Sequence, residues 1–447
     1  MKPHVLLINP WIYDFTAYNL WYKPLGLLQL AALLRINGIK VSFIDCLDDA
    51  PDMPLAKDVR PGKKRNDGAG GYSRQKIGKP LPLKMIPRNF HRFGLPPAFL
   101  LQKMHRFTRP DMIMITTMMT YWYPGLLEMI ALVRQVWPDV PVIIGGNYVS
   151  LCPEHAAQAG ADFCLPGPGE VSLPGIVKEL LKMDLQLLPD PNNLDSYPYP
   201  AFDLLRNPAS LPILTSRGCP YQCSYCASHL LYRDFRRRSP VLVAAEIEFW
   251  HRRYGIKNFS FYDDALLVNS EELAAPLLKE IIRRNLPLQF HCPNGLHLRE
   301  VTPEISALLF KAGFKTIRCG FETSDLLRQK QTGGKVNNEE LAEALKNLEN
   351  AGYCPSEIGI YILCGLPGQS AEEVAESIRY VQSLRARPIL AEYSPIPGTR
   401  LWPEAVASSP FPVAEEPLFQ NNTLLPCRNE SFTIEAYRKL KLMAREN

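Results

Sequence analysis

Three cysteines lie close together in the segment Arg217-Gly218-Cys219-Pro220-Tyr221-Gln222-Cys223-Ser224-Tyr225-Cys226. Their spacing is C-x3-C-x2-C, and no fourth cysteine follows nearby. Three thiolates can hold three irons of a 4Fe-4S cubane and leave the fourth iron open to a small molecule, whereas clusters that only transfer electrons usually take four thiolates. A zinc knuckle would need a fourth nearby ligand, and ordinary buried cysteines rarely crowd together. The spacing therefore favours a cluster with an open iron.

This spacing, with an aromatic residue just before the third cysteine, resembles the motif of the radical S-adenosylmethionine (SAM) superfamily. The resemblance implies that Cys219, Cys223 and Cys226 ligate the cluster, and that Tyr225 lies against the adenine of SAM. It also implies that the amino and carboxylate groups of SAM chelate the open iron. One electron from an external donor of flavodoxin or ferredoxin type would then cleave SAM to methionine and a 5'-deoxyadenosyl radical.

Length and composition indicate a globular protein of two to three domains. The chain has 447 residues, of which 46% are hydrophobic and 21% charged, and its net charge of +5 is too small to imply a nucleic-acid partner by itself. Eleven cysteines without a signal peptide favour a reducing compartment. No window resembles a membrane span. We expect a cytoplasmic monomer with an oxygen-sensitive cluster.

The amino-terminal part alternates short apolar runs with segments of helical pattern. The alternation predicts an α/β domain over residues 1–190, with a doubly wound, Rossmann-like parallel sheet. The expected strands are 4–8, 40–45, 112–116, 140–144 and 161–165, and the expected helices are 25–37, 125–136, 154–159 and 171–183. Ligands of such sheets bind at the carboxyl ends of the strands. Small or glycine-rich loops follow the strands there, so a large ligand can approach the backbone.

This layout resembles the cobalamin-binding domain that precedes the radical domain in one class of radical SAM enzymes. Its closest pieces are Gly145-Gly146 and Gly167-Pro168-Gly169-Glu170, where that class has Gly-Glu-Gly-Glu. The D-x-H-x-x-G motif that supplies a histidine to cobalt is absent, so the loop 117–123 is expected to meet the lower face of the corrin. The resemblance thus implies these cobalamin-binding residues: Asn9, Pro10, Thr117, Met118, Tyr121, Trp122, Gly145, Gly146, Asn147, Gly167, Gly169 and Glu170. The alternative is a vestigial sheet without cofactor, in which Met118, Met119 and Trp122 are core.

A basic, proline-rich insertion interrupts this domain at about 51–110. Basic residues are frequent in it, acids are almost missing, and aromatic residues such as Tyr72, Phe90 and Phe93 are present. A disordered linker would lack the aromatic residues, so we expect an extended arm followed by a short helix over 97–107. The charge suggests an anionic partner: a phosphate-bearing substrate, an acidic protein surface or RNA. A solvated loop is the alternative.

After a linker at 191–210, about six strand-helix units predict a partial (β/α)6 barrel over 211–400, followed by a carboxyl-terminal extension over 401–447 that covers the open side of the barrel. Polar residues after barrel strands lie at the carboxyl rim, where sites form. The rim candidates are Asp263, Asp264, Asn294, Arg299, Glu322, Ser324 and Gly365. Family resemblance places Asp263 and Asp264 near the methionine amino group of SAM, Glu322 and Ser324 near its ribose or methionine part, and Gly365 beside its adenine. Asp264 and Glu322 could equally cap helices.

Together the two resemblances imply a cobalamin-dependent radical SAM methyltransferase with three cofactors: a 4Fe-4S cluster, SAM and cobalamin. One SAM would methylate reduced cobalt, and a second would yield the radical that takes hydrogen from an unactivated carbon before methylcobalamin supplies the methyl group. No acid or base residue is nominated. A protein side chain, a lipid, a tetrapyrrole and an RNA base stay open as substrates. The alternatives are cyclisation, ring contraction or methylthiolation on the same apparatus, and a non-enzymatic sensor of cobalamin or redox state.

Overall fold

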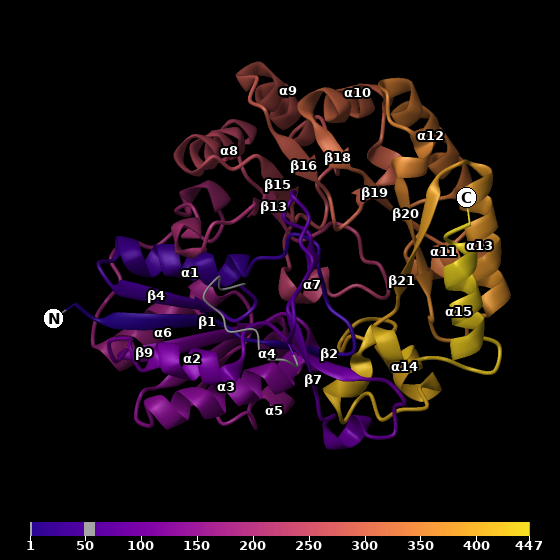
Figure 1. Ribbon diagram of the computed structural model, residues 1–447. Coiled ribbons are helices and arrows are strands. Elements are labelled where there is room, and N and C mark those ends of the chain that lie inside the picture. Colours follow the sequence, from indigo (N-terminus) through magenta and orange to yellow (C-terminus); the bar gives the residue numbers. More distant parts are fainter. Residues whose placement is uncertain (1, 49–58, 447) are drawn as a thin grey trace. The chain divides into compact units, whose positions relative to one another are not determined.

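The computed structural model describes residues 2–48 and 59–446, and the chain folds into two compact units (Figure 1). The first unit comprises residues 1–208 with 416–418, and the second comprises 209–415 with 419–447. No helix in the described ranges has the length and apolar character needed to cross a bilayer.

A five-stranded, wholly parallel sheet forms the centre of the first unit. Its strands are β1 (His4–Asn9), β4 (Lys40–Asp45), β9 (Met112–Thr117), β10 (Val142–Gly146) and β11 (Phe163–Leu165). The spatial order β11-β10-β9-β1-β4 reverses direction between β1 and β9. The open α/β sheet predicted from the alternation is confirmed. Ligands of such sheets bind where the order reverses, outside the carboxyl ends of the strands.

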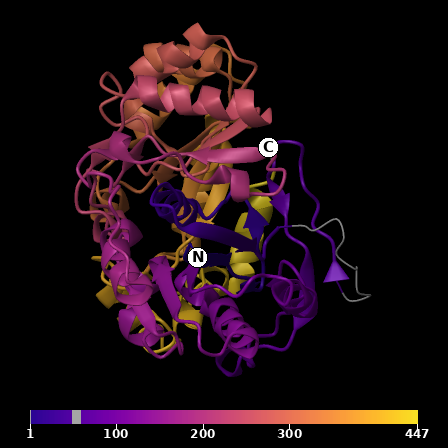
Figure 2. The same ribbon diagram turned by 90° about the vertical axis from the view of Figure 1, so that its left-hand side faces the viewer.

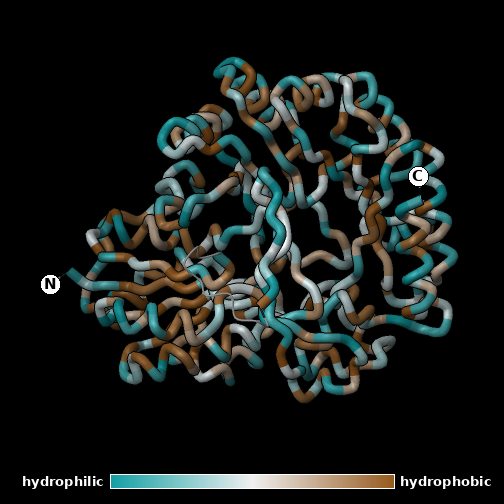
Figure 3. The backbone as a smooth tube through the Cα atoms, viewed as in Figure 1, coloured by the Kyte–Doolittle hydropathy of each residue, from teal (hydrophilic) through white to brown (hydrophobic). Residues whose placement is uncertain are grey.

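Helices cover both faces of this sheet because its strands are apolar on both sides. Every residue of β1 is buried, and the central strands are brown in the hydropathy view of Figure 3. Helices α1 and α6 share one core with the strands, whereas α3 lies on the other side of the strands in Figure 1. The helices are α1 (Leu25–Ile36), α3 (Tyr123–Val136), α4 (Asn147–Leu151), α5 (Pro153–Ala156) and α6 (Gly169–Leu181).

In the described residues the basic insertion supplies three strands of an antiparallel sheet, and the fourth strand comes from residues 12–14. The expectation of an extended arm was therefore wrong, whereas the short helix expected over 97–107 is present as α2. The sheet has the order β2-β8-β7-β5. Pairing satisfies the backbone groups, and Phe93 and Tyr72 are buried together with Ile12. A pair of short strands and one helix accompany the sheet; residues 51–58 of the insertion lie outside the described ranges. The elements are β2 (Ile12–Asp14), β3 (Tyr18–Asn19), β5 (Val59–Arg60), β6 (Gly70–Gly71), β7 (Arg74–Ile77), β8 (Phe90–Phe93) and α2 (Pro97–Met104).

The segment expected as a linker packs on α1 of the first unit. It forms two 3-10 turns, η3 (Leu194–Ser196) and η4 (Phe202–Leu204). The Ala201 N–H donates to the Leu28 carbonyl at 3.0 Å, and Arg35 forms an ion pair with Asp203 at 2.7 Å.

Two four-stranded parallel sheets form the wall of the second unit, in the orders β12-β15-β16-β18 and β17-β19-β20-β21. β17 follows β16 and β19 follows β18 after short breaks, so the chain supplies six successive strand positions. The predicted partial barrel is confirmed. Its strands are β12 (Ser210–Ile213), β15 (Asn258–Phe261), β16 (Gln289–His291), β17 (Leu296–His297), β18 (Phe314–Thr316), β19 (Arg318–Glu322), β20 (Gly359–Cys364) and β21 (Arg387–Glu392).

Helices follow these strands and lie on the outer surface of the wall (Figures 1 and 2). Several begin at a side-chain cap; in α12, Asn337 and Glu340 form a reciprocal capping box. The carboxyl-terminal helix α15 packs against α13, and Lys441 lies 3.7 Å from Glu392 of β21. The helices are α8 (Pro240–Tyr254), α9 (Ala274–Arg284), α10 (Pro303–Ala312), α11 (Leu326–Thr332), α12 (Asn338–Ala351), α13 (Ala371–Ser383), α14 (Trp402–Ser408) and α15 (Ile434–Met443).

Candidate functional site

The three cysteines lie on one loop between β13 (Ser216–Arg217) and α7 (Ser228–Leu231). All three thiols are free; Cys223 is buried, and Cys219 and Cys226 are partly exposed. The neighbouring chain holds the loop at Ser224, whose N–H donates to the Thr332 carbonyl at 3.1 Å and whose carbonyl accepts from the Leu401 N–H at 2.9 Å. The cysteine loop is therefore attached to two distant parts of the second unit.

The thiols are close enough to influence one another. Burial raises the pKa of Cys219 to about 11, and the charges of Asp264, Cys223 and Cys226 act in the same direction. Within residues 2–48 and 59–446, no three His, Cys, Asp or Glu side chains converge as they would on one ion. Cubane ligands bind separate irons and stand further apart than ligands of one ion, so three free thiols on one loop suit a cluster better than a single metal.

The adjacent carboxylates Asp263 and Asp264 have different surroundings. Asp263 is buried, and its Oδ1 accepts four hydrogen bonds from the backbone and hydroxyl groups of Thr215 and Ser216, at 2.6 to 2.9 Å. Asp264 is exposed. Asp263 therefore positions the chain that leads into the cysteine loop, whereas Asp264 is the carboxylate that a cationic ligand can reach.

Glu322 ends β19 in a strained backbone conformation, with a φ of +75°. Its carboxylate lies 2.5 Å from the Lys335 ammonium. Burial raises the pKa of Tyr225, and the charge of Glu322 raises it further. Glu322 thus links Lys335 to the aromatic residue of the cysteine loop. Ser324, two residues on, is hydrogen-bonded through its N–H to the Ser377 hydroxyl of α13 at 2.9 Å.

The Tyr225 ring packs against a cluster that contains Leu363, Leu366 and Tyr393. Leu363 and Leu366 flank Gly365, which has a φ of +79° and lies against Leu425 of the carboxyl-terminal extension. The structure therefore brings together the tyrosine and the glycine segment that were both predicted beside adenine.

Two other rim candidates make protein contacts. The Asn294 amide donates to the Tyr262 carbonyl at 2.9 Å, and Arg299 is paired with Glu340 at 2.8 Å. In the structure both side chains connect neighbouring elements of the barrel.

In the first unit, the predicted cobalamin residues gather at the carboxyl edge of the sheet. Asn9 and Thr117, both buried, end β1 and β9, the two strands that flank the reversal of strand order. Gly146 has a φ of +96°, and a Cβ there would lie 2.5 Å from the Thr117 carbonyl, so this glycine is required by the sheet itself. Further candidates lie at the end of β10, in the loops that follow the strands, or in the first turns of α4 and α6: Pro10, Met118, Gly145, Asn147, Gly167, Gly169 and Glu170.

Gly167 differs from Gly146 because a Cβ there would meet nothing within 4 Å. Its N–H donates to the Ser150 hydroxyl at 2.8 Å. An open, exposed glycine at this edge fits a large ligand that approaches the backbone closely.

The loop expected under the corrin contacts the insertion. Trp122 donates from Nε1 to the Asp14 carboxylate at 2.8 Å and packs on the cluster that contains Phe93. Tyr121 is buried, and Met118 is half-buried. Trp122 therefore has the packing role that the alternative interpretation of this loop expected.

Comparison with protein families decides the class of the protein. The model of the radical SAM superfamily matches residues 213–381, which include the cysteine loop, and the model of the B12 binding domain matches residues 94–177. The chain carries a B12-binding domain and a radical SAM domain. The recognition from the cysteine spacing and the glycine loops is confirmed.

Relatives of this chain carry different names. An uncharacterized methyltransferase of Pyrococcus horikoshii is 26% identical over 62% of this chain and 66% of its own length. An anaerobic magnesium-protoporphyrin IX monomethyl ester cyclase of Cereibacter sphaeroides is 28% identical over 42% of this chain and 31% of its own length. The chain thus spans two thirds or less of these relatives.

The fold is also similar to that of a solved radical SAM methyltransferase, TsrM from Kitasatospora setae. The TM-score is 0.64 with 18% sequence identity, and the match covers 91% of this chain and 76% of that one. At this identity the likeness concerns the fold.

The two domains account for the three cofactors predicted from the sequence: the radical SAM domain for a 4Fe-4S cluster and SAM, and the B12-binding domain for cobalamin. The free thiols of the cysteine loop and the open edge at Gly167 fit them. The contacts assigned to single residues stay predictions. Sequence reasoning missed Lys335 and the pair Thr215-Ser216; the Gly333-Gly334 pair just before Lys335 was a signal of close backbone approach.

Proposed function

We propose that this radical SAM protein is a cobalamin-dependent C-methyltransferase. The observation that supports this most strongly is the presence of both cofactor domains in one chain, together with the methyltransferase names of the Pyrococcus horikoshii relative and of TsrM. When bound, the cofactors supply a 5'-deoxyadenosyl radical that abstracts hydrogen from an unactivated carbon, and the methyl group that replaces it.

The side chains bind and orient these groups. In the proposal, Cys219, Cys223 and Cys226 hold three irons and leave the fourth for SAM. Exposed Asp264 lies at the end of β15, beside Cys219, where a carboxylate suits the cationic amino group of SAM. Buried Asp263 holds the backbone before the loop. No protein acid or base is needed, because the cofactors carry the chemistry and the protein positions them and excludes water.

The insertion supports an anionic substrate. Arg60 and Arg74 are directly opposite each other in the pairing of β5 and β7, and Lys76 lies on the same face two residues further along. All three are exposed, and no carboxylate in the described ranges pairs with them. Like charges directly across a strand pair are destabilising by a few tenths of a kcal/mol or more. An anionic substrate would relieve this repulsion.

The pKa of His91 is affected by the same three positive charges. It is opposite Lys76 in the pairing of β7 and β8. Burial lowers the pKa of His91, and Arg74, Arg60 and Lys76 lower it further.

Methylation is tested with SAM that carries a deuterated methyl group. The reconstituted full chain is incubated anaerobically with dithionite and with extract from a strain that lacks the protein, and labelled products are sought by mass spectrometry. We expect label in a product and release of 5'-deoxyadenosine, both lost in Cys223→Ala, which should still bind cobalamin. Turnover by cobalamin-free protein would contradict the proposal.

A second candidate is cyclisation, favoured by the cyclase among the relatives. It predicts 5'-deoxyadenosine release and a product that lacks the labelled methyl group, so the same experiment distinguishes the two reactions.

The proposed anion site on the insertion, formed by Arg60, Arg74 and Lys76, is tested with inorganic pyrophosphate as the probe. We expect pyrophosphate to raise the melting temperature of the wild type and to have a smaller effect on Arg74→Gln/Lys76→Gln. Lys84→Gln removes an exposed charge elsewhere in the insertion and should respond like the wild type. Equal responses of all three proteins would refute the anion site.

A further inference from the structure

The loop after α11 lies directly against the cysteine loop. Besides the hydrogen bond from Ser224 to Thr332, Gly333 approaches so closely that a Cβ there would lie 3.1 Å from the Cys223 Cα. Gly333 has a φ of +133°, which a side chain would strain. The chain therefore passes Cys223 at backbone contact, and two residues later it carries Lys335.

Lys335 places its ammonium group in a mostly buried position beside this loop. Its Nζ lies 2.5 Å from Glu322 Oε1 and 5.9 Å from the centroid of the Tyr225 ring. The exposed fractions of the two charged side chains are 17% and 10%. A Cβ on Gly320 would lie 3.0 Å from Nζ and 2.9 Å from Oε1, so a glycine at this point of β19 leaves room for the pair.

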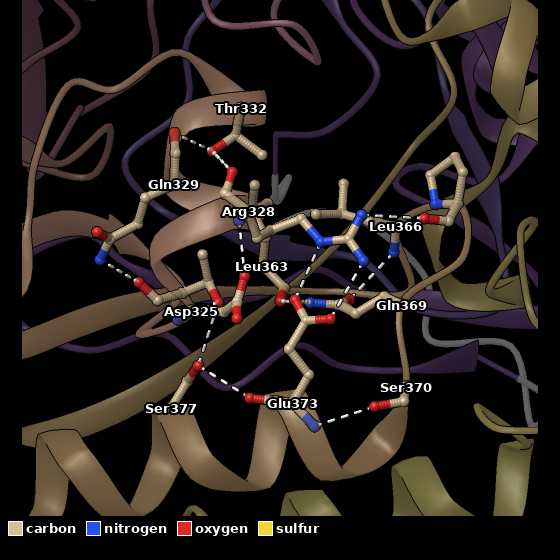
Figure 4. Close-up of polar contacts among 12 residues, drawn as sticks. Asp325, Arg328, Gln329, Thr332, Leu363, Leu366, Gln369, Ser370, Glu373 and Ser377 are labelled. Carbon is tan, nitrogen blue, oxygen red and sulfur yellow. Dashed lines mark hydrogen bonds and ion pairs between the residues drawn. The ribbon is translucent and has the colours of Figure 1, made fainter.

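A network of polar contacts fixes α11, which supports this loop (Figure 4). Arg328 forms an ion pair with Glu373 of α13 at 3.1 Å. Gln329 donates to the Thr323 carbonyl at 2.8 Å, and the Thr332 hydroxyl donates to the Arg328 carbonyl at 2.9 Å. These contacts hold the end of α11 in place, and with it the start of the loop that contains Lys335.

The charges around the cysteine loop are asymmetric. The Lys335 ammonium and the Glu322 carboxylate both lie close enough to Cys223 to act on it electrostatically, in opposite directions. Burial opposes the charge of Lys335, but Glu322 and the thiols of Cys223 and Cys226 raise its pKa, so the lysine stays protonated. Glu322 also acts on Tyr225 of the cysteine loop and raises the pKa of its phenol. Near Cys219 the neighbouring charge is the carboxylate of Asp264.

We propose that Lys335 is a positioning residue that raises the reduction potential of the cluster held by the cysteine loop. This inference rests on the proposed function, because it requires the cluster. Reduction by one electron from an external one-electron donor adds one negative charge to the cluster, and a nearby cation stabilises the charge in a poorly solvated site. The potential of such clusters depends on net charge and local environment.

The test is a potentiometric titration of the reconstituted full chain without SAM, followed by electron paramagnetic resonance of the reduced cluster. Lys335→Met should lower the midpoint potential, so that about tenfold less cluster is reduced at a fixed potential, which is about 59 mV for a one-electron couple. Lys335→Arg keeps the charge and should stay near the wild type. Lys330→Met removes an exposed charge from α11, the helix that precedes the loop with Lys335, and should not shift the potential.

A midpoint of Lys335→Met equal to that of the wild type, at equal iron content, would overturn the inference. Lys335→Met leaves Glu322 buried without its partner, which destabilises proteins, so a second comparison isolates the charge. Glu322→Gln should shift the potential upward, and Glu322→Gln/Lys335→Met should lie below Glu322→Gln. Equal potentials of these two variants would equally overturn it.

Results that contradict the proposed function differ from results that contradict only the role of Lys335. Wild-type protein that binds no iron-sulfur cluster, or that holds a cluster but never cleaves SAM, would contradict the proposed function. An assembled cluster whose potential does not depend on Lys335 contradicts only this inference.

Discussion

The Asp263 carboxylate accepts hydrogen bonds from both the N–H and the hydroxyl of Thr215, at 2.9 and 2.7 Å. Ser216 contributes the same two donors to the same oxygen. The end of β15 thus holds the chain just before the cysteine loop, although 47 or 48 residues separate the partners in sequence.

Asp263→Ala should lower the free energy of unfolding by about 3 kcal/mol or more, because it leaves several buried donors without an acceptor, each at about 1–3 kcal/mol. Denaturant unfolding of the apoprotein measures this. Asp264→Ala removes a carboxylate that has contact with solvent and a hydrogen bond with Ser228, so it should cost about 1 kcal/mol or less. Equal losses in both variants would show that Asp263 is not the structural carboxylate of the pair.

Asp263 also predicts a pH dependence of stability. Burial raises its pKa from the ordinary value of 3.8 to about 6, against the lowering effect of its hydrogen bonds. Between these two values the folded protein binds more protons at Asp263 than the unfolded chain does. This contribution to stability is therefore complete below about pH 4 and is lost as the pH rises through about 6.

Asp263→Asn cannot ionise and should lack this component. Unfolding free energies of both proteins, measured at several values from pH 4 to pH 7, should show the wild type losing stability relative to Asp263→Asn as the pH rises. A constant difference between the two proteins would contradict the shifted pKa.

Gly333→Ala should reduce assembly of the cluster, because the new Cβ would press on the Cys223 backbone. Iron per chain and cluster absorbance after anaerobic reconstitution are the measurements. Gly334→Ala is the matched control: its φ is +61°, but a Cβ there meets nothing within 4 Å. If both variants incorporate iron like the wild type, the contact at Gly333 does not set the position of Cys223.

Gly167→Gln should weaken cobalamin binding at least tenfold, because the side chain would protrude from the open carboxyl edge of the first sheet. Gly160 offers a close control in the same unit. It has a φ of +79° against +77° for Gly167, and both positions are open, but Gly160 precedes β11 and lies at the opposite end of that strand. Equilibrium dialysis read by corrin absorbance should show normal binding by Gly160→Gln; similar losses in both variants would remove the carboxyl edge as the cobalamin site.

Much of the fold followed from local pattern. Apolar runs of strand length alternated with helical segments, so the parallel sheet of the first unit and the parallel strands of the partial barrel were predictable. In the insertion the pattern was insufficient, because pairing of β2 with β8 joins segments nearly 80 residues apart, which no local periodicity records.

By itself, the sequence determined that three thiols lie on one short loop, because only a few residues separate the cysteines along the chain. It also determined that glycine-rich loops follow the strands of a parallel sheet. Only the tertiary structure separated Asp263 from Asp264, because burial and hydrogen-bond donors come from a distant strand. It also placed Lys335 beside Cys223, more than a hundred residues away in sequence. Charge acts through space, so the electrostatic environment of the cysteine loop depends on the fold and cannot be found from the spacing of the cysteines.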